Sequence, residues 1–283
     1  MPRSGSTLLM NLLAQHHQFH VTPTNGLLGM VSVVRDTWAQ NDAFKAQGLQ
    51  KIEPRIAASL RAMMYGFYER ELASGKVVFD KSRGWIAHLE LLEQMFGRPI
   101  PVICTVRDTR AVVASFEKLH RKNPLVRRQY LGPAYIQATT IDGRARVLTG
   151  PGGVIGLPIN LIRDARNRGM ANRVILVPYR MLTAQPLETL AYIHQRLGLA
   201  PWAGYKPDHV EQVTQEDDAG HGWGYDLHNI RSKVEPPEDL PWKGVLPPHT
   251  LHWLEEAFSD INQLAAASID TPLSGGSPIA EDL

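Results

Sequence analysis

Hydrophobic positions recur along the chain at two different spacings, and each spacing predicts its own kind of element. Helical spacing is clearest in residues 54–74, whose apolar side chains fall on one face: Ile56, Leu60, Met63, Met64 and Phe67. Helices are also predicted from near Ser6 and at residues 85–96, 109–119, 187–197 and 249–267. Short apolar runs, typical of buried strands, occupy residues 76–79, 101–106 and 173–177. Strands that alternate with helices indicate an α/β fold with a central parallel sheet flanked by helices.

Two stretches interrupt this alternation. Residues 121–157 carry several basic side chains and a Pro-Gly-Gly turn, typical of a lid inserted over the sheet's carboxyl edge or of a solvated surface excursion. Residues 268–283 combine Pro, Gly, Ser and acidic side chains, a composition that predicts poor order.

A domain holds about 150 residues, so 283 residues allow one large domain or two small ones. With no internal repeat, we expect one domain over residues 1–267.

Charge and cysteine content disfavour several classes of protein. Thirty Lys and Arg against 28 Asp and Glu leave a net charge of +2, unlike a bulk nucleic-acid binder. One cysteine, Cys104, excludes an intrachain disulfide and a Cys-rich zinc site, and its strand predicts a buried core position. No apolar run approaches the roughly 20 residues of a membrane span, and no signal peptide is visible. We therefore expect a cytoplasmic protein that binds no nucleic acid.

A group of histidines follows the first helix. His16, His17 and His20 lack the H-E-x-x-H spacing of a metal site, and no carboxylate cluster flanks them. Their pattern predicts an exposed helix end rather than a metal centre.

The segment just before the first helix has the chemistry of an anion-binding loop. Residues 2–7 read Pro-Arg-Ser-Gly-Ser-Thr. A glycine lets the backbone approach an anion closely, and the N–H groups and dipole of a helix N-terminus favour negative charge. A simple helix N-cap is the alternative interpretation. The loop lacks the lysine of G-x-x-x-x-G-K-[ST], which disfavours a magnesium-dependent nucleotide triphosphatase.

A second candidate anion site follows the strand at residues 101–106. Arg107 stands where this strand ends, at the edge where open α/β sheets bind ligands. Asp108 is placed to cap the next helix, and Ser115 lies about two turns into it. Taken singly, the residues are typical of a surface arginine and a helix-face serine.

Together the two sites resemble the sulfotransferase family. In that family a loop like residues 2–7 binds the 5′-phosphosulfate, and an Arg followed eight residues later by a Ser binds the 3′-phosphate. Arg107 and Ser115 match this second motif. The resemblance implies 3′-phosphoadenosine 5′-phosphosulfate as donor, in-line transfer of its sulfuryl group to a hydroxyl or amine, and no metal.

Further segments agree with this resemblance over residues 1–199. Residues 77–82 are similar to the family's central strand and its catalytic lysine, which makes Lys81 the expected contact of the leaving oxygen. Residues 230–235 and the loop resemble the branch of bacterial and tyrosylprotein enzymes. The resemblance implies the following donor-binding residues: Arg3, Ser4, Gly5, Ser6, Thr7, Arg107, Ser115, Tyr179 and Lys233.

The acceptor side departs from the family pattern. Cytosolic members carry a catalytic His where this chain has Arg83, and tyrosylprotein members carry a catalytic Glu at a position that falls on Thr24. We therefore consider Asp36, Asp80 and His88 as candidate bases and favour Asp36. The acceptor is expected to be a small molecule, sugar, lipid or peptide, and its identity and the oligomeric state stay open.

Two alternative functions remain at this point. A small-molecule P-loop kinase would need a loop lysine and a magnesium-binding acid, and neither is clear in the sequence. A nucleotide-binding remnant would keep both anion sites without turnover, which the missing family bases allow.

The start of the chain also departs from the family. A strand precedes the anion loop in relatives, whereas here only Met1 precedes Pro2. We expect either a start upstream or a sheet without its N-terminal strand. Neighbouring strands would then have unpaired backbone groups, so a chain extended by a short apolar strand should melt at a higher temperature.

Overall fold

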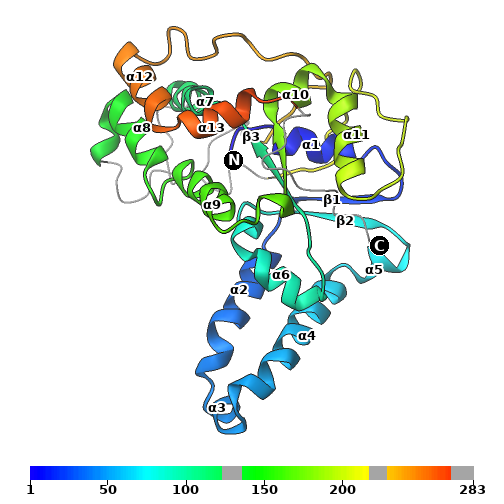
Figure 1. Ribbon diagram of the computed structural model, residues 1–283. Coiled ribbons are helices and arrows are strands. Elements are labelled where there is room, and N and C mark those ends of the chain that lie inside the picture. The colour runs from blue at the N-terminus through cyan, green and yellow to red at the C-terminus, as the bar shows by residue number, and fades with distance from the viewer. Residues whose placement is uncertain (123–135, 217–227, 269–283) are drawn as a thin grey trace.

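We describe a computed structural model of the chain, which places residues 1–122, 136–216 and 228–268 (Figure 1). The strands are β1 (Phe19–Thr24), β2 (Val77–Lys81), β3 (Val102–Val106) and β4 (Val174–Pro178). The first helices are α1 (Ser6–Leu13), α2 (Leu27–Thr37), α3 (Asp42–Gln47), α4 (Leu49–Phe67), α5 (Glu69–Ala73), α6 (Leu89–Phe96) and α7 (Thr109–Lys122). The later helices are α8 (Ile141–Thr149), α9 (Gly156–Asn167), α10 (Tyr179–Ala184), α11 (Pro186–Arg196), α12 (Pro248–Ala257) and α13 (Ser259–Ala266). Short 3-10 turns lie at η1 (Trp38–Gln40), η2 (Trp85–His88) and η4 (Ala171–Arg173).

The strands form two small parallel sheets rather than the single central sheet that the sequence predicts. β1 pairs with β2, and β3 pairs with β4, both in parallel register. Residues of β2 and β3 line one cavity, so a hollow separates the two pairs. The parallel direction was predicted correctly, and the division into two pairs was not.

Register at the carboxyl ends of the strands sets the position of the functional side chains. Val106 pairs with Pro178, which places Arg107 and Tyr179 next to each other. At the end of the other sheet, Thr24 pairs with Lys81.

The β3–β4 pair is covered on both faces. Along β4, Val174 and Leu176 belong to an apolar cluster shared with α7, α8, α9 and α13. The alternate residues Ile175 and Val177 belong to a second cluster, which includes the leucines of α1 and residues of α11. Because successive strand side chains point to opposite faces, β4 is fully buried and α1 is held against it.

The described part of residues 121–157 contributes to the first of these clusters. Ala145 and Leu148 of α8, together with Ile155, are buried in it. Residues 123–135 of this segment and residues 269–283 of the tail lie outside the described part of the chain.

Helices α2, α3 and α4 project from the rest of the molecule as a helical hairpin (Figure 1). The predicted helix over residues 54–74 begins earlier, at Leu49, and contains Pro54 within it. It ends at Phe67, and α5 follows after a break at Tyr68. The Tyr68 side chain is buried and hydrogen-bonded to Asn25 and Asp80, so tertiary contacts hold the break in place.

Strand β1 is absent from the sequence-based prediction. Of the histidines predicted to form an exposed helix end, His17 is exposed, whereas His16 is buried and His20 is half-buried on β1. His16 is only 6% exposed and stacks on Phe19 at a ring distance of 4.0 Å. His194 and Trp202 also pack against its ring. Burial lowers the pKa of His16 and favours the neutral ring, so His16 packs as an aromatic core residue.

Candidate functional site

The loop before α1 has a backbone that requires glycine at one position. Gly5 has a φ of 88°, in the left-handed region. A Cβ at Gly5 would also lie 2.7 Å from Cδ2 of Tyr179. Arg3 has a φ of 54°, so the chain turns tightly between residues 3 and 5. Residues 5–7 at the start of α1 line a cavity, and a helix N-terminus in such a place favours negative charge.

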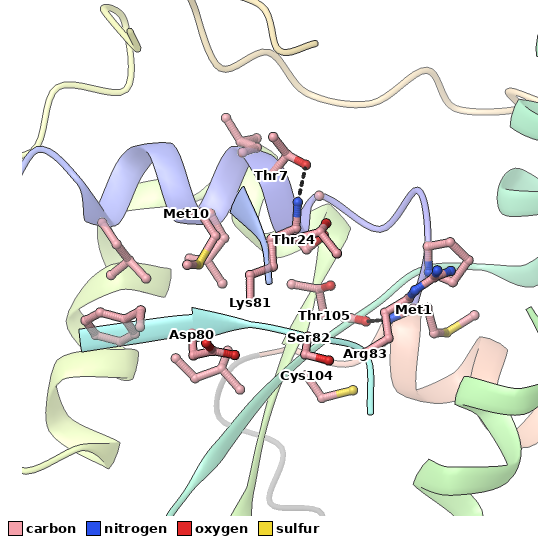
Figure 2. A pocket seen from close by; sticks show the side chains of 18 of the residues that line it. Met1, Thr7, Met10, Thr24, Asp80, Lys81, Ser82, Arg83, Cys104 and Thr105 are labelled. Carbon is pink, nitrogen blue, oxygen red and sulfur yellow. Dashed lines mark hydrogen bonds between the residues drawn. The ribbon is translucent and has the colours of Figure 1, made fainter. Parts of the chain in front are cut away.

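Two contacts attach this loop to the end of β3. The Met1 amino group donates to the Thr105 carbonyl oxygen at 2.8 Å, and burial lowers the pKa of that amine (Figure 2). The Ser4 hydroxyl lies 2.7 Å from the Thr105 hydroxyl and is fully buried. Ser4 was expected among the donor-binding residues. The structure instead turns its hydroxyl away from the cavity, so this side chain anchors the loop.

Arg3, Arg107 and Ser115 lie together at one end of the cavity. The Arg3 Nε donates to the Ser115 hydroxyl at 3.0 Å, and the Arg107 Nη1 donates to the Arg3 carbonyl oxygen at 2.9 Å. The Arg107 guanidinium also lies over the Tyr179 ring at 4.2 Å. Burial lowers the pKa of Arg107, although an arginine stays charged in proteins. The grouping of these four residues makes a cationic position for an anionic ligand.

The helix after Arg107 starts as the sequence indicates. The Asp108 carboxylate accepts the backbone N–H of Arg110 at 2.8 Å and the Arg110 guanidinium at 2.7 Å. Asp108 therefore caps α7 and holds the register between Arg107 and Ser115.

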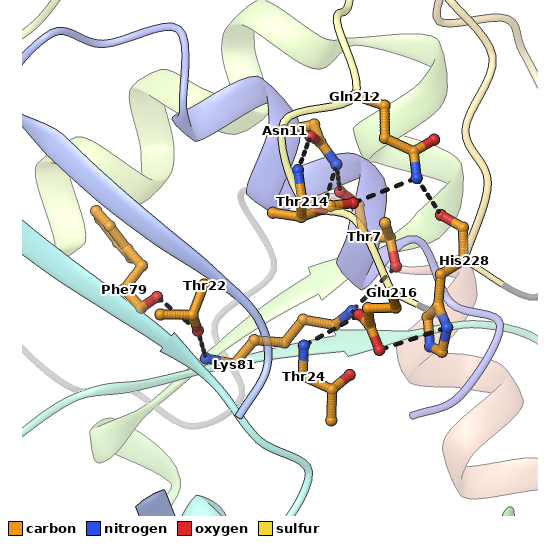
Figure 3. Close-up of polar contacts among 10 residues, drawn as sticks. All are labelled: Thr7, Asn11, Thr22, Thr24, Phe79, Lys81, Gln212, Thr214, Glu216 and His228. Atoms are coloured by element: carbon orange, nitrogen blue, oxygen red, sulfur yellow. Dashed lines mark hydrogen bonds and ion pairs between the residues drawn. The ribbon is translucent and has the colours of Figure 1, made fainter. Parts of the chain in front are cut away.

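Lys81 lies at the end of β2 and reaches the anion loop. Its Nζ donates to the Thr7 hydroxyl at 3.1 Å and to Glu216 Oε1 at 2.7 Å (Figures 2 and 3). Its backbone N–H donates to the Thr22 hydroxyl at 2.9 Å, which keeps the strand end against β1. The ammonium is thus a fixed point charge beside the loop.

Glu216 and His228 belong to this site and were missed by the sequence analysis. Glu216 Oε1 also accepts the backbone N–H of Thr24 at 3.0 Å, and Oε2 lies 3.4 Å from His228 Nδ1. Burial acts to raise the pKa of Glu216, but the hydrogen bond and charge of Lys81 outweigh it and hold the pKa below its usual value. Glu216 is thus an ionised carboxylate. It is hydrogen-bonded to the backbone of Thr24, the residue that falls at the position of the glutamate in tyrosylprotein members.

A buried asparagine of α1 supports this part of the site. Asn11 Oδ1 accepts the backbone N–H of Val213 at 2.6 Å, and its Nδ2 donates to the Thr214 hydroxyl at 2.8 Å. Gln212 Nε2 donates to the His228 carbonyl oxygen at 3.3 Å (Figure 3). The helix that begins at the anion loop therefore also positions the segment with Glu216. A polar residue among the leucines of α1 was the signal available in the sequence.

Asp80 lines the cavity, but its carboxylate is already satisfied. It accepts the Trp85 indole N–H at 2.6 Å and the Asn25 amide at 2.7 Å, and it is hydrogen-bonded to the Tyr68 hydroxyl. Burial and the bond to Asp80 raise the pKa of Tyr68 above its usual value. Asp80 therefore fixes the turn beside Lys81 by three hydrogen bonds.

The structure does not bring Asp36 or His88 to the cavity. Asp36 lies on α2, more than half exposed, and forms an ion pair with Arg35 at 2.6 Å. Arg35 also lies 2.6 Å from His88 Nδ1. The two candidates are therefore linked through Arg35, outside the residues that line the cavity.

The cavity has a volume of about 1300 Å³ and joins the two strand pairs to the anion loop. Cys104 lines it and is half-buried, and it packs against the first apolar cluster, so the core position that the sequence predicts is confirmed in part. The remaining donor-binding candidates also line it: Arg3, Gly5, Ser6, Thr7, Arg107, Ser115, Tyr179 and Lys233. Ser4 is the expected donor-binding residue that does not.

Two kinds of site are absent from the described residues. No three His, Cys, Asp or Glu side chains in residues 1–122, 136–216 and 228–268 are grouped to hold a metal ion. Across the same residues, no helix has both the length and the apolar character that crossing a bilayer requires.

Comparison with known proteins connects this geometry to a family. A family model described as "Sulfotransferase family" matches residues 1–204. The sulfotransferase domain from the curacin biosynthetic pathway aligns with a TM-score of 0.57 and 18% identity, covering 91% of this chain and 94% of that chain. The sulfotransferase domain from the Synechococcus PCC 7002 olefin synthase aligns with a TM-score of 0.50 and 20% identity, covering 91% of each chain. At these identities the two structures show a shared fold. No curated protein matches the sequence significantly.

Proposed function

Because the chain belongs to the sulfotransferase family, we propose that it transfers the sulfuryl group of 3′-phosphoadenosine 5′-phosphosulfate to an acceptor hydroxyl or amine by in-line displacement. One observation carries the proposal: two cationic positions line a single cavity. One is Lys81, which donates to the Thr7 hydroxyl. The other is Arg107, which donates to the carbonyl oxygen of Arg3, and the Arg3 side chain in turn donates to Ser115. A donor with one anionic group at each end fits this arrangement.

The loop end of the cavity suits the 5′-phosphosulfate. The amides of Gly5, Ser6 and Thr7 lie at the start of α1, where the helix dipole favours an anion. Negative charge accumulates on the bridging oxygen as the S–O bond breaks, and Lys81 stabilises it. Catalysis then rests on positioning and electrostatic stabilisation.

The other end suits the 3′-phosphate and the adenine. Arg107 provides a charge-assisted contact, with the Ser115 hydroxyl beside it. The Tyr179 ring, which lies against both Gly5 and Arg107, offers an aromatic face near the base. Lys233 is exposed at the cavity rim and adds a further cation.

A product assay tests the proposal. The protein is incubated with donor and a panel of phenols, sugars, lipids and peptides, without added metal, and 3′,5′-phosphoadenosine is quantified. We expect product to form with one acceptor class. Donor binding without turnover on the whole panel would indicate a nucleotide-binding remnant, and magnesium-dependent ATP turnover would indicate a kinase.

Replacing Arg107 tests the 3′-phosphate position. We expect Arg107→Ala to raise the donor Kd by about tenfold or more in calorimetry, because a hydrogen bond to a charged group contributes roughly 1.5–3 kcal/mol. The matched control is Arg55→Ala, since Arg55 is exposed on α4. Adenosine 5′-phosphosulfate, which lacks the 3′-phosphate, should bind both variants and the wild type equally. Unchanged affinity for the full donor in Arg107→Ala would remove Arg107 from the site.

A further inference from the structure

The side chains of Lys81, Glu216 and His228 form a chain of charged and polar groups inside the cavity. Lys81 Nζ lies 2.7 Å from Glu216 Oε1, and Glu216 Oε2 lies 3.4 Å from His228 Nδ1. These residues come from β2 and from two positions far along the sequence, and all line the same cavity (Figure 3). A carboxylate between a cation and an imidazole is the arrangement that orients a histidine for proton transfer.

We propose that His228 is the general base that takes the proton of the acceptor hydroxyl, and that Glu216 is the residue that positions it. This assignment rests on the proposed sulfuryl transfer. Glu216 faces Nδ1, so the nitrogen that takes the proton is Nε2, on the opposite side of the ring.

Glu216 is poorly suited to be the base itself. Its Oε1 already accepts hydrogen bonds from Lys81 and from the Thr24 backbone. Lys81 keeps the pKa of Glu216 below its usual value, so the carboxylate has little affinity for a proton near neutral pH. The Glu216 side chain is 7% exposed, whereas that of His228 is 22% exposed and accessible from the cavity. An imidazole can accept a proton on one ring nitrogen while a carboxylate orients the other, as this role requires.

The proposed step transfers one sulfuryl group and one proton. The acceptor oxygen forms a bond to sulfur while the bond from sulfur to the bridging oxygen breaks. The electron pair of the broken bond stays on that oxygen, which leaves with 3′,5′-phosphoadenosine and is stabilised by Lys81. The acceptor proton passes to Nε2 of His228 and is later released to water. Glu216 thereby touches both the group that stabilises the leaving oxygen and the group that activates the nucleophile.

Variants of both residues test the assignment with acceptors of graded acidity. The probes are p-nitrophenol, phenol and benzyl alcohol, and kcat/KM is measured as a function of pH. We expect His228→Gln to lower kcat/KM by roughly a hundredfold or more. The loss should be larger for benzyl alcohol than for p-nitrophenol, since an acidic phenol needs less help from a base. His228→Gln should also remove the fall in rate on the acid side of the profile, and imidazole should partly restore His228→Ala.

Glu216→Gln separates positioning from proton transfer. We expect this variant to lower kcat but to keep the acid-side fall in rate, because His228 is still present. The matched control is His209→Gln, since His209 forms an exposed pair with Glu211 outside the cavity. Donor binding measured by calorimetry should be unchanged in His228→Gln, which shows that the variant folds.

Two results would overturn the assignment. A His228→Gln variant with a wild-type rate and pH profile would do so. So would a Glu216→Gln variant that loses the acid-side fall while His228→Gln keeps it, because the proton would then go to Glu216. If the wild-type protein turns over no member of the acceptor panel, the proposed function itself is contradicted. That result is distinct from a failure of the His228 assignment, in which the wild type is active.

Discussion

Replacing Lys81 with methionine is expected to lower kcat by about 10²- to 10³-fold while changing the donor Kd by no more than about threefold. The reason is that charge on the bridging oxygen grows only as the S–O bond breaks, so a fixed cation there stabilises the transition state more than the bound donor. Thr7 and Glu216 hold the ammonium beside the loop at 3.1 and 2.7 Å. The measurement is kcat with saturating donor, together with calorimetry of donor binding.

Removal of Lys81 also leaves the Glu216 carboxylate buried without its cation, which costs stability. The double variant Lys81→Met with Glu216→Gln removes both charges and separates a folding defect from a catalytic one. We expect it to melt near the wild-type temperature and to remain catalytically impaired. Lys51→Met is the matched control, because Lys51 is exposed on α4. A single variant with kcat close to that of the wild type and intact donor binding would exclude Lys81 as the stabilising cation.

The geometry of the two candidate anion-binding segments could be predicted because each is local in sequence. Gly5 and the first turn of α1 are consecutive residues, and Asp108 caps the helix that runs from just after Arg107 to beyond Ser115. The helical and strand periods of their flanking residues were sufficient to place the first segment at a helix start and the second at a strand end. What the local pattern did not show is the direction of Ser4, which depends on the position of Thr105 in another strand.

Glu216 and His228 could not be predicted because no local pattern contains them. The segment with Glu216 is held by hydrogen bonds between Asn11 and residues 213–214, which lie at the other end of the chain. Gln212 of that segment also donates to the His228 carbonyl oxygen. Asp36 was favoured because the resemblance places the segment after the anion loop in the acceptor cleft, but α2 carries this residue into the helical hairpin. Sequence proximity was therefore enough to group the candidate donor-binding residues, which are local, but not Glu216 and His228, which meet Lys81 only in the folded chain.

Helix α8 is also held by an ion pair between residues that are distant in sequence, Arg144 of α8 and Glu117 of α7. Glu117 of α7 is 4% exposed, and its two carboxylate oxygens accept the Arg144 guanidinium of α8 at 2.8 and 3.0 Å. Arg121 also donates to it at 3.0 Å. Burial acts to raise the pKa of Glu117, but the hydrogen bonds from Arg144 and Arg121 outweigh it and hold the pKa below its usual value. The buried Glu117 carboxylate is therefore paired with two guanidinium groups.

Glu117→Gln is expected to lower the free energy of unfolding by about 3–5 kcal/mol, because it leaves the Arg144 guanidinium buried without its anion. Since the folded protein has the lower pKa for Glu117, this stabilisation is present above the pKa of the unfolded state. It is lost as pH falls through the folded pKa. The difference between wild type and variant, measured by urea unfolding, should therefore be largest near pH 7 and shrink toward pH 3.

Two companion variants decide whether the ion pair is the cause. Glu256→Gln removes a carboxylate that pairs with His252 on an exposed helix face, and it should change stability by no more than about 1 kcal/mol. Glu117→Leu combined with Arg144→Met removes both buried charges, and it should be more stable than Glu117→Leu by itself. If the single and double variants were equally unstable, the loss would come from packing between α7 and α8 rather than from an unpaired guanidinium.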